Sequence, residues 1–188
     1  MVSVIIPTRN SERALVSTLA PLVSGATAGL VTEVILADGG SQDETAKVAD
    51  VAGCKLLVAD APLAARLKAA AAAARAPWLM FLRPGTVLDT PWTSEAWRFV
   101  QQDARNGRAA VFRRAESADT AARAMALALA ALLRRRPDPG QGLLLTKRLY
   151  DALGGHSEVA SDPESDLIRR IGRSRIATLA TAAFTEDT

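Results

Sequence analysis

The stretch Glu33-Val-Ile-Leu-Ala-Asp38-Gly-Gly-Ser41-Gln-Asp43-Glu44-Thr45 decides the fold class. It begins with a short apolar run of strand length and then turns on two glycines. Ser41, followed three residues later by Glu44, is a capping-box signature and predicts a helix from Asp43 to Ala52. Asp38 is predicted at the carboxyl end of the strand, where ligands bind in open α/β sheets. A plain strand-to-helix turn has the same pattern, so this stretch alone favours a ligand only slightly.

Outward from this stretch, apolar runs of strand length alternate with helical segments. Strands joined by helices are almost always parallel, so the order predicts an α/β protein with a doubly wound, mostly parallel sheet and helices on both faces. The predicted strands are Val2 to Ile6, Glu33 to Ala37, Lys55 to Ala59, Trp78 to Leu82, Ala109 to Arg113 and Gly142 to Thr146. The predicted helices are Ser11 to Val23, Asp43 to Ala52, Pro62 to Arg75, Pro91 to Asn106, Asp119 to Arg136, Lys147 to Leu153 and Ser161 to Gly172. Residues 24–29 read as a linker, and residues 185–188 as a frayed tail.

Composition narrows the classes of function. The 188 residues suffice for one domain, and 49% hydrophobic with 23% charged residues is ordinary for a soluble protein. A net charge of +3 without a basic block argues against a nucleic-acid groove. Cys54 and His156 are the only residues of their kinds, which excludes an internal disulfide and His-rich or multi-cysteine metal sites.

The sequence contains neither a signal peptide at Met1 to Pro7 nor an apolar run of the ~20 residues that a membrane span needs. We therefore expect a cytoplasmic protein. Arg134, Arg135 and Arg136 end a predicted helix, where cations interact favourably with the helix dipole. The alternative is that this triplet binds a diphosphate or the phospholipids of the inner membrane, as a peripheral contact.

Known phosphate and nucleophile motifs are missing: there is no GxGxxG, no P-loop and no GxSxG. The start Val2-Ser-Val-Ile-Ile-Pro-Thr-Arg-Asn10 together with the Asp38 stretch instead resembles family 2 glycosyltransferases of the GT-A fold. The resemblance continues through Trp78 to Leu82, Gln141 to Gly155 and Asp166 to Gly172. It covers roughly residues 2 to 175, and it is similar to the short bacterial members that lack a membrane anchor.

The resemblance implies one GT-A domain over residues 1–188, with a nucleotide-binding half in residues 1–90 and an acceptor-side half in residues 91–188. It implies a nucleoside diphosphate-sugar donor and an acceptor that the sequence does not identify. Thr8, Arg9 and Asn10 match the loop against the nucleotide, and Asp38 matches the aspartate that reads the base. The simpler interpretation of Arg9 and Asn10 is a solvated turn and a helix cap.

Further roles follow from the same resemblance. Arg66 matches an arginine near the phosphates, although a surface position on an amphipathic helix explains it equally. Gln141 falls in the acceptor-side segment and is a candidate substrate-binding residue. Glu164 stands at the catalytic-base position, as the one carboxylate left of the usual Glu-Asp pair. It also completes a capping box with Ser161, which is the structural alternative.

One departure from the family concerns the metal. The family places Asp-x-Asp after the strand that ends at Leu82, to hold Mn²⁺ or Mg²⁺ on the diphosphate. Here Arg83-Pro84-Gly85 stands in its place, and Asp89 is the next carboxylate. We therefore expect no metal cofactor, and we expect Arg83 to contact the diphosphate directly, since arginine presents a fork of donors to phosphate. A decayed site is the alternative interpretation of the same residues.

Three hypotheses for function remain, in descending order. The first is a glycosyltransferase, metal-independent in this chain, with Glu164 as the base. The second is an inactive GT-A-fold protein that binds a nucleotide-sugar or keeps only the fold. The third is an S-adenosylmethionine-dependent methyltransferase, which fits poorly because here the acidic residue precedes the glycines and follows the second strand.

Overall fold

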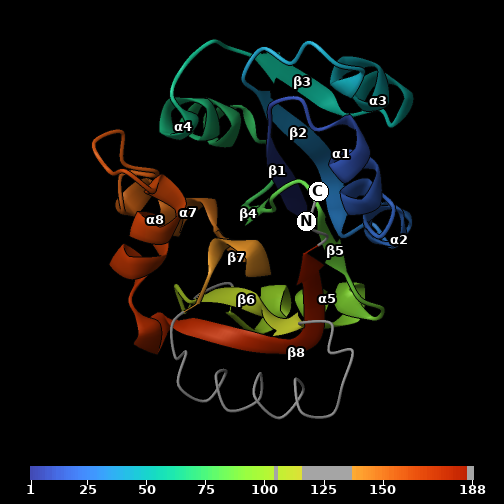
Figure 1. The fold of residues 1–188 in the computed structure, drawn as a ribbon. Helices are drawn as coiled ribbons and strands as arrows, with labels where there is room; N and C mark the ends of the chain where they lie inside the picture. Colours follow the sequence, from blue (N-terminus) through green and yellow to red (C-terminus); the bar gives the residue numbers. More distant parts are fainter. Residues whose placement is uncertain (104–105, 116–136, 186–188) are drawn as a thin grey trace, which may run out of the picture.

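The computed structural model describes residues 1–103, 106–115 and 137–185, and within them eight strands form one sheet in the order β3-β2-β1-β4-β7-β6-β8-β5 (Figure 1). The strands are β1 Val2–Thr8, β2 Val31–Asp38, β3 Lys55–Val58, β4 Trp78–Phe81, β5 Thr86–Leu88, β6 Ala109–Ala115, β7 Leu143–Thr146 and β8 Ile176–Thr185. The helices are α1 Glu12–Leu19, α2 Leu22–Thr27, α3 Thr45–Val51, α4 Leu63–Ala73, α5 Trp92–Asp103, α7 Lys147–Ala152 and α8 Pro163–Ile171, with short 3-10 turns η1 Pro139–Gln141 and η2 Arg173–Arg175. The helix predicted over residues 119–136, with its arginine triplet, lies outside the described residues.

The amino-terminal half of the sheet is parallel, as predicted. β3, β2, β1 and β4 lie side by side in one direction, and their carboxyl ends meet at one edge. Thr8 pairs with Asp38 in register, and Ile5 pairs with Phe81. This edge therefore collects the residues that follow β1, β2 and β4, which include most of the predicted site.

The other half of the sheet is mixed. β7 runs antiparallel to β4 and β6, β8 runs parallel to β6, and β5 pairs antiparallel with β8. Four of the seven described pairings are thus parallel, which confirms a mostly parallel sheet. Neither β5 nor β8 was predicted. Thr185, placed in the frayed tail by sequence, pairs with Thr86 at the end of β8.

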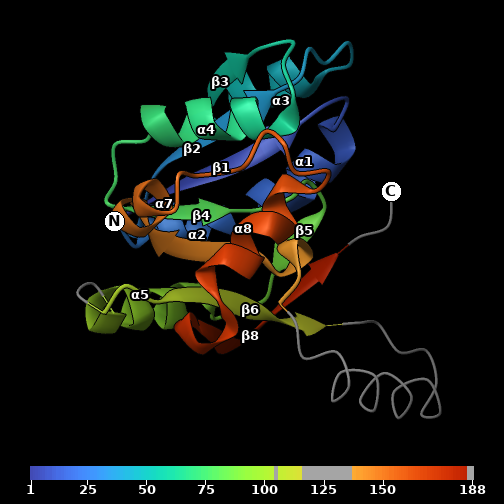
Figure 2. The same ribbon diagram turned by 90° about the vertical axis from the view of Figure 1, so that its left-hand side faces the viewer.

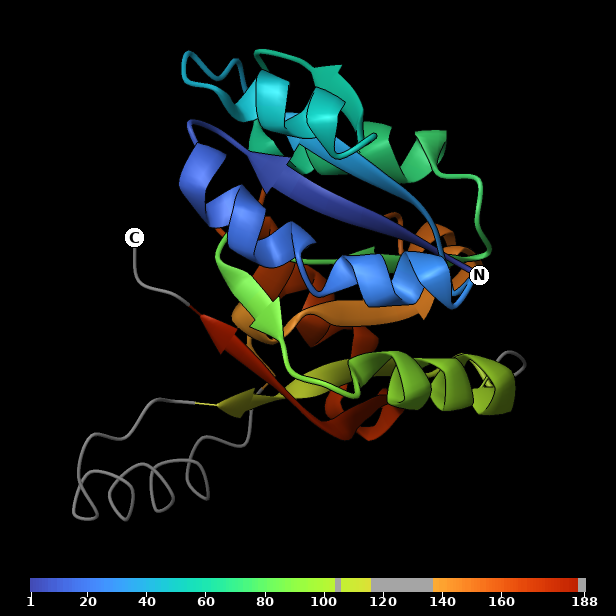
Figure 3. The same cartoon turned by 90° about the vertical axis from the view of Figure 1, so that its right-hand side faces the viewer.

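Helices cover both faces of the sheet, as predicted. On one face α1, α2 and α5 pack over β-strand residues such as Val4 and Ile6 (Figure 3). On the other face α4, α7 and α8 pack over residues such as Ile5 and Leu79 (Figure 2). The alternation between Val4, Ile5 and Ile6 follows from the two-residue period of a strand that is buried on both sides. None of the helices in the described ranges has the length and apolar character of a membrane span.

The linker predicted at residues 24–29 is wrong over most of its length, because residues 24–27 belong to α2. The helix predicted from Ser11 to Val23 divides at Pro21, which has no N–H to continue the α1 ladder. Gly25 looked like a linker signal, but it serves close packing. A Cβ atom at Gly25 would lie 2.6 Å from the ring of Trp92, so only glycine lets α2 and α5 approach this closely.

Two buried threonines sit at the turn after β4, and they give opposite predictions. Thr18 on α1 accepts a hydrogen bond from the Gly85 N–H (2.8 Å) and donates to the Ala14 carbonyl, so it holds the turn that carries Arg83. Thr86 Oγ1 is buried without a partner among the described residues. We expect Thr86→Val to stabilise the fold by about 1 kcal/mol and Thr18→Val to destabilise it by about 1–2 kcal/mol, as measured by urea denaturation. Equal effects of the two substitutions would contradict this assignment.

Candidate functional site

Asp38 ends β2, is buried, and lies beside Thr8 at the end of β1. Its oxygens accept hydrogen bonds from the hydroxyls of Thr8 (2.8 Å) and Ser41 (2.5 Å) and from the N–H groups of Gly40 (2.9 Å) and Ser41 (2.8 Å). Burial alone would raise the pKa of Asp38, but the bonds from Ser41, Thr8 and Gly40 outweigh it and lower the pKa. Asp38 is thus an ionised carboxylate whose hydrogen bonds fix the loop after β2. Its contact with a nucleotide base stays a prediction, and it requires one of these donors to give way.

The loops after β1 and β2 are fastened to each other. The Asn10 N–H donates to Ser41 Oγ (2.9 Å), and the Gln42 N–H donates to Asn10 Oδ1 (2.8 Å). Asn10 has φ +50°, in the left-handed region that asparagine tolerates better than most residues. Its side chain therefore bridges two loops. The simpler interpretation of the sequence, in which Asn10 caps α1, is wrong.

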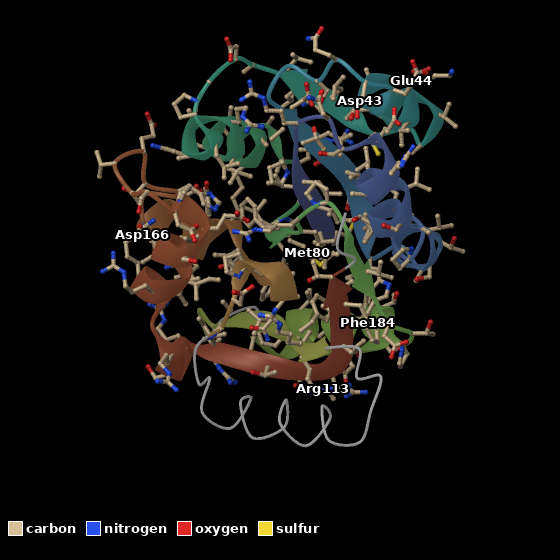
Figure 4. The ribbon with its side chains drawn as sticks, viewed as in Figure 1. Asp43, Glu44, Met80, Arg113, Asp166 and Phe184 are labelled. Atoms are coloured by element: carbon tan, nitrogen blue, oxygen red, sulfur yellow. The ribbon has the colours of Figure 1, made fainter. Side chains whose placement is uncertain are left out.

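The first turns of α1 and α3 cap each other across these loops. The N–H groups of Ser11 and Glu12 donate to Thr45 Oγ1 (3.0 Å) and Asp43 Oδ2 (3.1 Å), and the Glu44 N–H donates to Glu12 Oε2 (3.0 Å). Figure 4 labels Asp43 and Glu44 at this junction. The exchange satisfies N–H groups that a helix start leaves unpaired, and it joins the two loops into one rigid floor.

The capping box predicted between Ser41 and Glu44 is wrong. The Ser41 hydroxyl donates to Asp38, and α3 begins only at Thr45, without a side-chain cap from Glu44. The Ser41 oxygen instead accepts from the Asn10 N–H (2.9 Å), so it is engaged between the two loops and not at the start of α3.

Arg66 on α4 anchors the carboxyl ends of β1 and β2. Its Nη1 donates to the carbonyls of Ala37 (2.5 Å) and Thr8 (3.2 Å), and its Nε donates to the Ala61 carbonyl (3.1 Å). The guanidinium packs against Gly39, where a Cβ atom would lie 3.1 Å from Arg66 Cζ. Arg66 is therefore part of the site floor and not a free surface residue of an amphipathic helix.

A second arginine lies close to Arg66. Burial lowers the pKa of Arg66; the charge of Asp38 opposes this shift, and the charge of Arg9 adds to it. Arg9 itself is exposed. Two like charges at the edge of β1 and β2 repel each other, so an anion placed between them would be stabilised.

Arg83 and Glu164 form an ion pair across the site. Arg83 Nε donates to Glu164 Oε2 (2.9 Å), and Arg83 Nη2 lies 2.7 Å from the same oxygen. The Glu164 side chain is 10% exposed and that of Arg83 is 40% exposed. Burial lowers the pKa of Arg83, but Glu164, and after it Asp162 and Asp138, outweigh this and raise the pKa. The structure thus brings together the residue at the missing metal motif and the residue at the catalytic-base position.

The start of α8 also departs from the prediction. The capping box between Ser161 and Glu164 does not form; Asp162 is the N-cap and accepts from the Ser165 N–H (3.1 Å). Glu164 turns to Arg83 instead. Both carboxylates lie in the first turn of α8 or at its N-cap. The capping alternative for Glu164 is therefore removed, and a catalytic role remains open to it.

Gln141 is engaged at both ends of its amide. Its Oε1 accepts from the Asp138 N–H (2.8 Å), and its Nε2 donates to the Phe112 carbonyl (2.7 Å). These bonds fix η1 against β6. The substrate-binding role of Gln141 stays a prediction, and its visible role is to hold Asp138 near Arg83.

Sequence reasoning missed a buried cluster behind the end of β4. His156 is 1% exposed, its Nδ1 lies 2.9 Å from the Tyr150 hydroxyl, and its ring packs edge-on to Phe81 with centroids 4.9 Å apart. Burial lowers the pKa of His156 to about 4; the charge of Arg170 adds to the shift and that of Asp166 opposes it. The imidazole is thus neutral at physiological pH and supports the strand that leads to Arg83. The sequence offered one signal, a lone histidine directly after Gly154-Gly155.

A shallow groove of about 380 Å³ lies beside this cluster and is lined by Lys68, residues 153–158, Asp166 and Arg170. Arg170 donates to Asp166 Oδ2 and to the carbonyls of Leu153 and Gly155, each at 2.6 Å. Lys68 pairs with Glu158 at 3.4 Å. Asp166, labelled in Figure 4, is two residues from Glu164 and so on a different face of α8. The charged residues of the groove thus pair with one another, and neither Arg83 nor Glu164 takes part in these pairs.

The residues after β4 do not fit the divalent cation that the resemblance implies. Arg83-Pro84-Gly85 offers no carboxylate, and cations such as Mn²⁺ prefer hard oxygen ligands. Asp89 is exposed and follows β5, beyond the turn that carries Arg83. Across residues 1–103, 106–115 and 137–185, no group of three His, Cys, Asp or Glu residues is arranged to hold a metal. A guanidinium stands where the cation would be expected to act.

The depressed pKa of His156 predicts a pH-dependent stability. Its ordinary value of 6.5 applies to the unfolded chain, so the unfolded state binds more protons between about pH 6.5 and the folded value near 4. Stability should be full above about pH 6.5 and fall by about 3 kcal/mol as the pH drops to 4. His156→Gln should flatten this part of the curve. NMR titration of the only histidine checks the pKa directly, and a midpoint near 6.5 would contradict the burial of a neutral ring.

Solved structures of similar fold include a mannosyltransferase and a glucosyl-3-phosphoglycerate synthase. The mannosyltransferase PcManGT from Pyrobaculum calidifontis, in complex with GDP-Man and Mn²⁺, aligns with a TM-score of 0.73 at 15% identity, covering 97% of this chain and 56% of that chain. Residues 1–349 of TarS from S. aureus give 0.69 at 14%, covering 98% and 60%. Glucosyl-3-phosphoglycerate synthase from Mycobacterium tuberculosis, with Mn²⁺ and UDP-glucose, gives 0.70 at 17%, covering 100% and 72%. The chain thus spans little more than half of the first two.

Sequence comparison points the same way. A search of curated proteins finds no match. The family model described as Glycosyl transferase family 2 matches residues 3–140, which include β1, the Asp38 loop, Arg66 and the Arg83 turn. This match covers well over half of the chain, and the fold agrees with it. The chain therefore belongs to glycosyl transferase family 2 and has the GT-A fold.

Proposed function

We propose that this domain is a glycosyltransferase that moves a sugar from a nucleoside diphosphate-sugar to an acceptor hydroxyl, with Glu164 as the general base. The observation that carries the proposal is the placement of Glu164. It is nearly buried at the start of α8, it is held by Arg83 at the end of β4, and its Oε1 makes no hydrogen bond to a described residue. One carboxylate oxygen is thus fixed and the other is available to a hydroxyl.

The donor belongs at the carboxyl edge of β1 and β2. The loops of Thr8 to Asn10 and of Asp38 to Gln42 are cross-linked, so they offer a pre-formed surface for the nucleotide. Arg9 and Arg66 place positive charge beside it. The similar structures with GDP-Man and with UDP-glucose support this class of donor.

The reaction needs few groups. Glu164 Oε1 accepts the proton of the acceptor hydroxyl as its oxygen bonds to the anomeric carbon of the sugar. The bond from that carbon to the diphosphate oxygen breaks, and the nucleoside diphosphate leaves with the electron pair. A base within hydrogen-bond reach of the hydroxyl and positive charge on the leaving group are both required.

We infer that arginine supplies the positive charge in place of a metal ion. Arg83 is held in its charged form by Glu164, Asp162 and Asp138, and it follows β4 where the family carries its aspartates. The guanidinium fork suits phosphate oxygens better than a single ammonium group does.

The alternative is a domain that binds the nucleotide-sugar without turning it over. The Arg83–Glu164 contact favours it to some degree, because each charge is already partly neutralised by the other. The experiment below separates the two functions by measuring binding and turnover in the same preparations.

Glu164→Gln tests the proposal. UDP-glucose and GDP-mannose are first tested for binding by calorimetry, and release of UDP or GDP is then followed with a panel of acceptors. We expect the variant to keep the dissociation constant of the parent within about threefold and to lose turnover by about 10²- to 10⁴-fold, the usual contribution of a general base.

Glu158→Gln is the matched control. Glu158 is also a glutamate close to α8, but it is 56% exposed, and its ion-pair partner among the described residues is Lys68. This exposed pair should contribute less than about 1 kcal/mol to stability, and its loss should leave turnover intact. Full turnover in Glu164→Gln would remove the base role from Glu164. Donor binding without turnover in the parent would favour the binding protein.

A further inference from the structure

In the Arg83–Glu164 contact, each side chain uses only part of its polar atoms and leaves one atom without a partner among the described residues. Two nitrogens on one edge of the guanidinium face the single oxygen Oε2: Nε donates a hydrogen bond to it (2.9 Å), and Nη2 lies 2.7 Å from it. Glu164 Oε1 and Arg83 Nη1 make no hydrogen bond with any residue that the structure describes. The Arg83 side chain is 40% exposed and that of Glu164 is 10% exposed, so the pair is closed on the carboxylate side and open on the guanidinium side.

The backbone of Arg83 is fixed where β4 ends. The Leu82 N–H donates to the Ile5 carbonyl (3.0 Å), the Thr86 N–H donates to the Arg83 carbonyl (3.0 Å), and Gly85 is held by Thr18. The guanidinium therefore projects from a rigid turn beside β1. That turn faces the same sheet edge as Thr8 and Asp38, the proposed donor edge.

Carboxylates surround the protein side of Arg83. Glu164, Asp162 and Asp138 all act on its charge, and Asp162 is itself held at the N-cap of α8. Glu164 occupies the edge of the guanidinium formed by Nε and Nη2. The outer nitrogen Nη1 remains for a negatively charged group that arrives from solvent.

We propose that Arg83 is a bridge: its Nε and Nη2 edge positions the base Glu164, while Nη1 binds the diphosphate of the donor at the same time. This inference rests on the proposed function, and it adds that one planar group sets the geometry between leaving group and base. Donor binding then orders the base, because a guanidinium held by phosphate on one side holds Oε2 of Glu164 with less freedom on the other, and this fixes the direction of Oε1. Arg83 is thus a positioning residue toward Glu164 and a ligand toward the donor.

A bridge of this kind needs the fork of arginine. A lysine keeps the positive charge, but it has a single nitrogen. Its ammonium group cannot hold Oε2 through two nitrogens and contact the phosphate through a third. Arg83→Lys therefore keeps the positive charge and removes the bridge, whereas Arg83→Gln removes both. This difference gives a readout that a purely structural ion pair would not move, because binding and turnover should respond differently.

The test measures the dissociation constant of UDP and GDP by calorimetry and turnover of the bound donor in four variants: Arg83→Lys, Arg83→Gln, Glu164→Gln and the double variant Arg83→Lys with Glu164→Gln. We expect Arg83→Gln to weaken nucleoside diphosphate binding more than tenfold. Arg83→Lys should weaken it less than threefold and yet lose turnover to the level of Glu164→Gln. The double variant should be no slower than Glu164→Gln alone, since both substitutions break one unit.

Arg75→Lys serves as the matched control. Arg75 also pairs with a nearly buried glutamate, Glu33, at 3.1 Å, but this pair lies near the amino end of β2. Arg75→Lys should change neither the dissociation constants of UDP and GDP nor turnover. If Arg83→Gln does not fold, as judged by circular dichroism, Arg83→Lys and the double variant still decide.

Three results would overturn the bridge. Unchanged nucleotide affinity in Arg83→Gln would remove the phosphate contact, and full turnover in Arg83→Lys would show that charge alone suffices. A multiplicative loss in the double variant would show that Arg83 and Glu164 act independently. A parent protein that binds no nucleoside diphosphate at all would contradict the proposed function as well, and so the two failures are distinguishable.

Discussion

The ion pair between Arg83 and Glu164 is the contact on which the site depends. A carboxylate that is 90% buried needs a partner, since an unpaired charge in such a place is costly. The partner comes from the end of β4, 81 positions earlier in the chain. The pair therefore fixes α8 against the parallel half of the sheet. Among the described residues, the other ion pair that joins residues 1–90 to residues 91–188 is the exposed pair of Lys68 with Glu158.

The parallel half supplies the other fixed element. Asp38 accepts hydrogen bonds from Thr8 at the end of β1 and from its own loop, and Asn10, Ser11 and Glu12 continue the connection toward α3. A surface held by this many short-range contacts loses little freedom when a ligand binds. The two parts of the site thus have different roles. The β1 and β2 loops form a rigid surface, and the Arg83–Glu164 pair places a positive charge and the base beside it.

The sequence predicted most of what depends on local patterns. The apolar runs in β1, β2 and β4, and the turn at Asp38, were sufficient for the fold class and for the edge at which the site lies. β8 was missed because residues 176–185 are rich in alanine and show no clear alternation of large apolar side chains. The two capping boxes were wrong for a tertiary reason: the Ser41 oxygen accepts from the Asn10 N–H of the loop after β1, and Glu164 pairs with Arg83 after β4. A contact such as that of Arg83 with Glu164 has no signature in local sequence, so each residue was chosen separately and their pairing was found only in the structure.

The central claim is that a guanidinium does here what a divalent cation does elsewhere in the family. Calorimetric titration of UDP and of GDP into the protein, once in EDTA and once in Mn²⁺, tests it most directly. The account predicts the same dissociation constant in both buffers, because Arg83, together with Arg9 and Arg66 at the adjacent strand ends, carries the positive charge that the diphosphate needs. A requirement for Mn²⁺ would contradict it and would make Asp89, the next carboxylate after the turn, the first residue to examine.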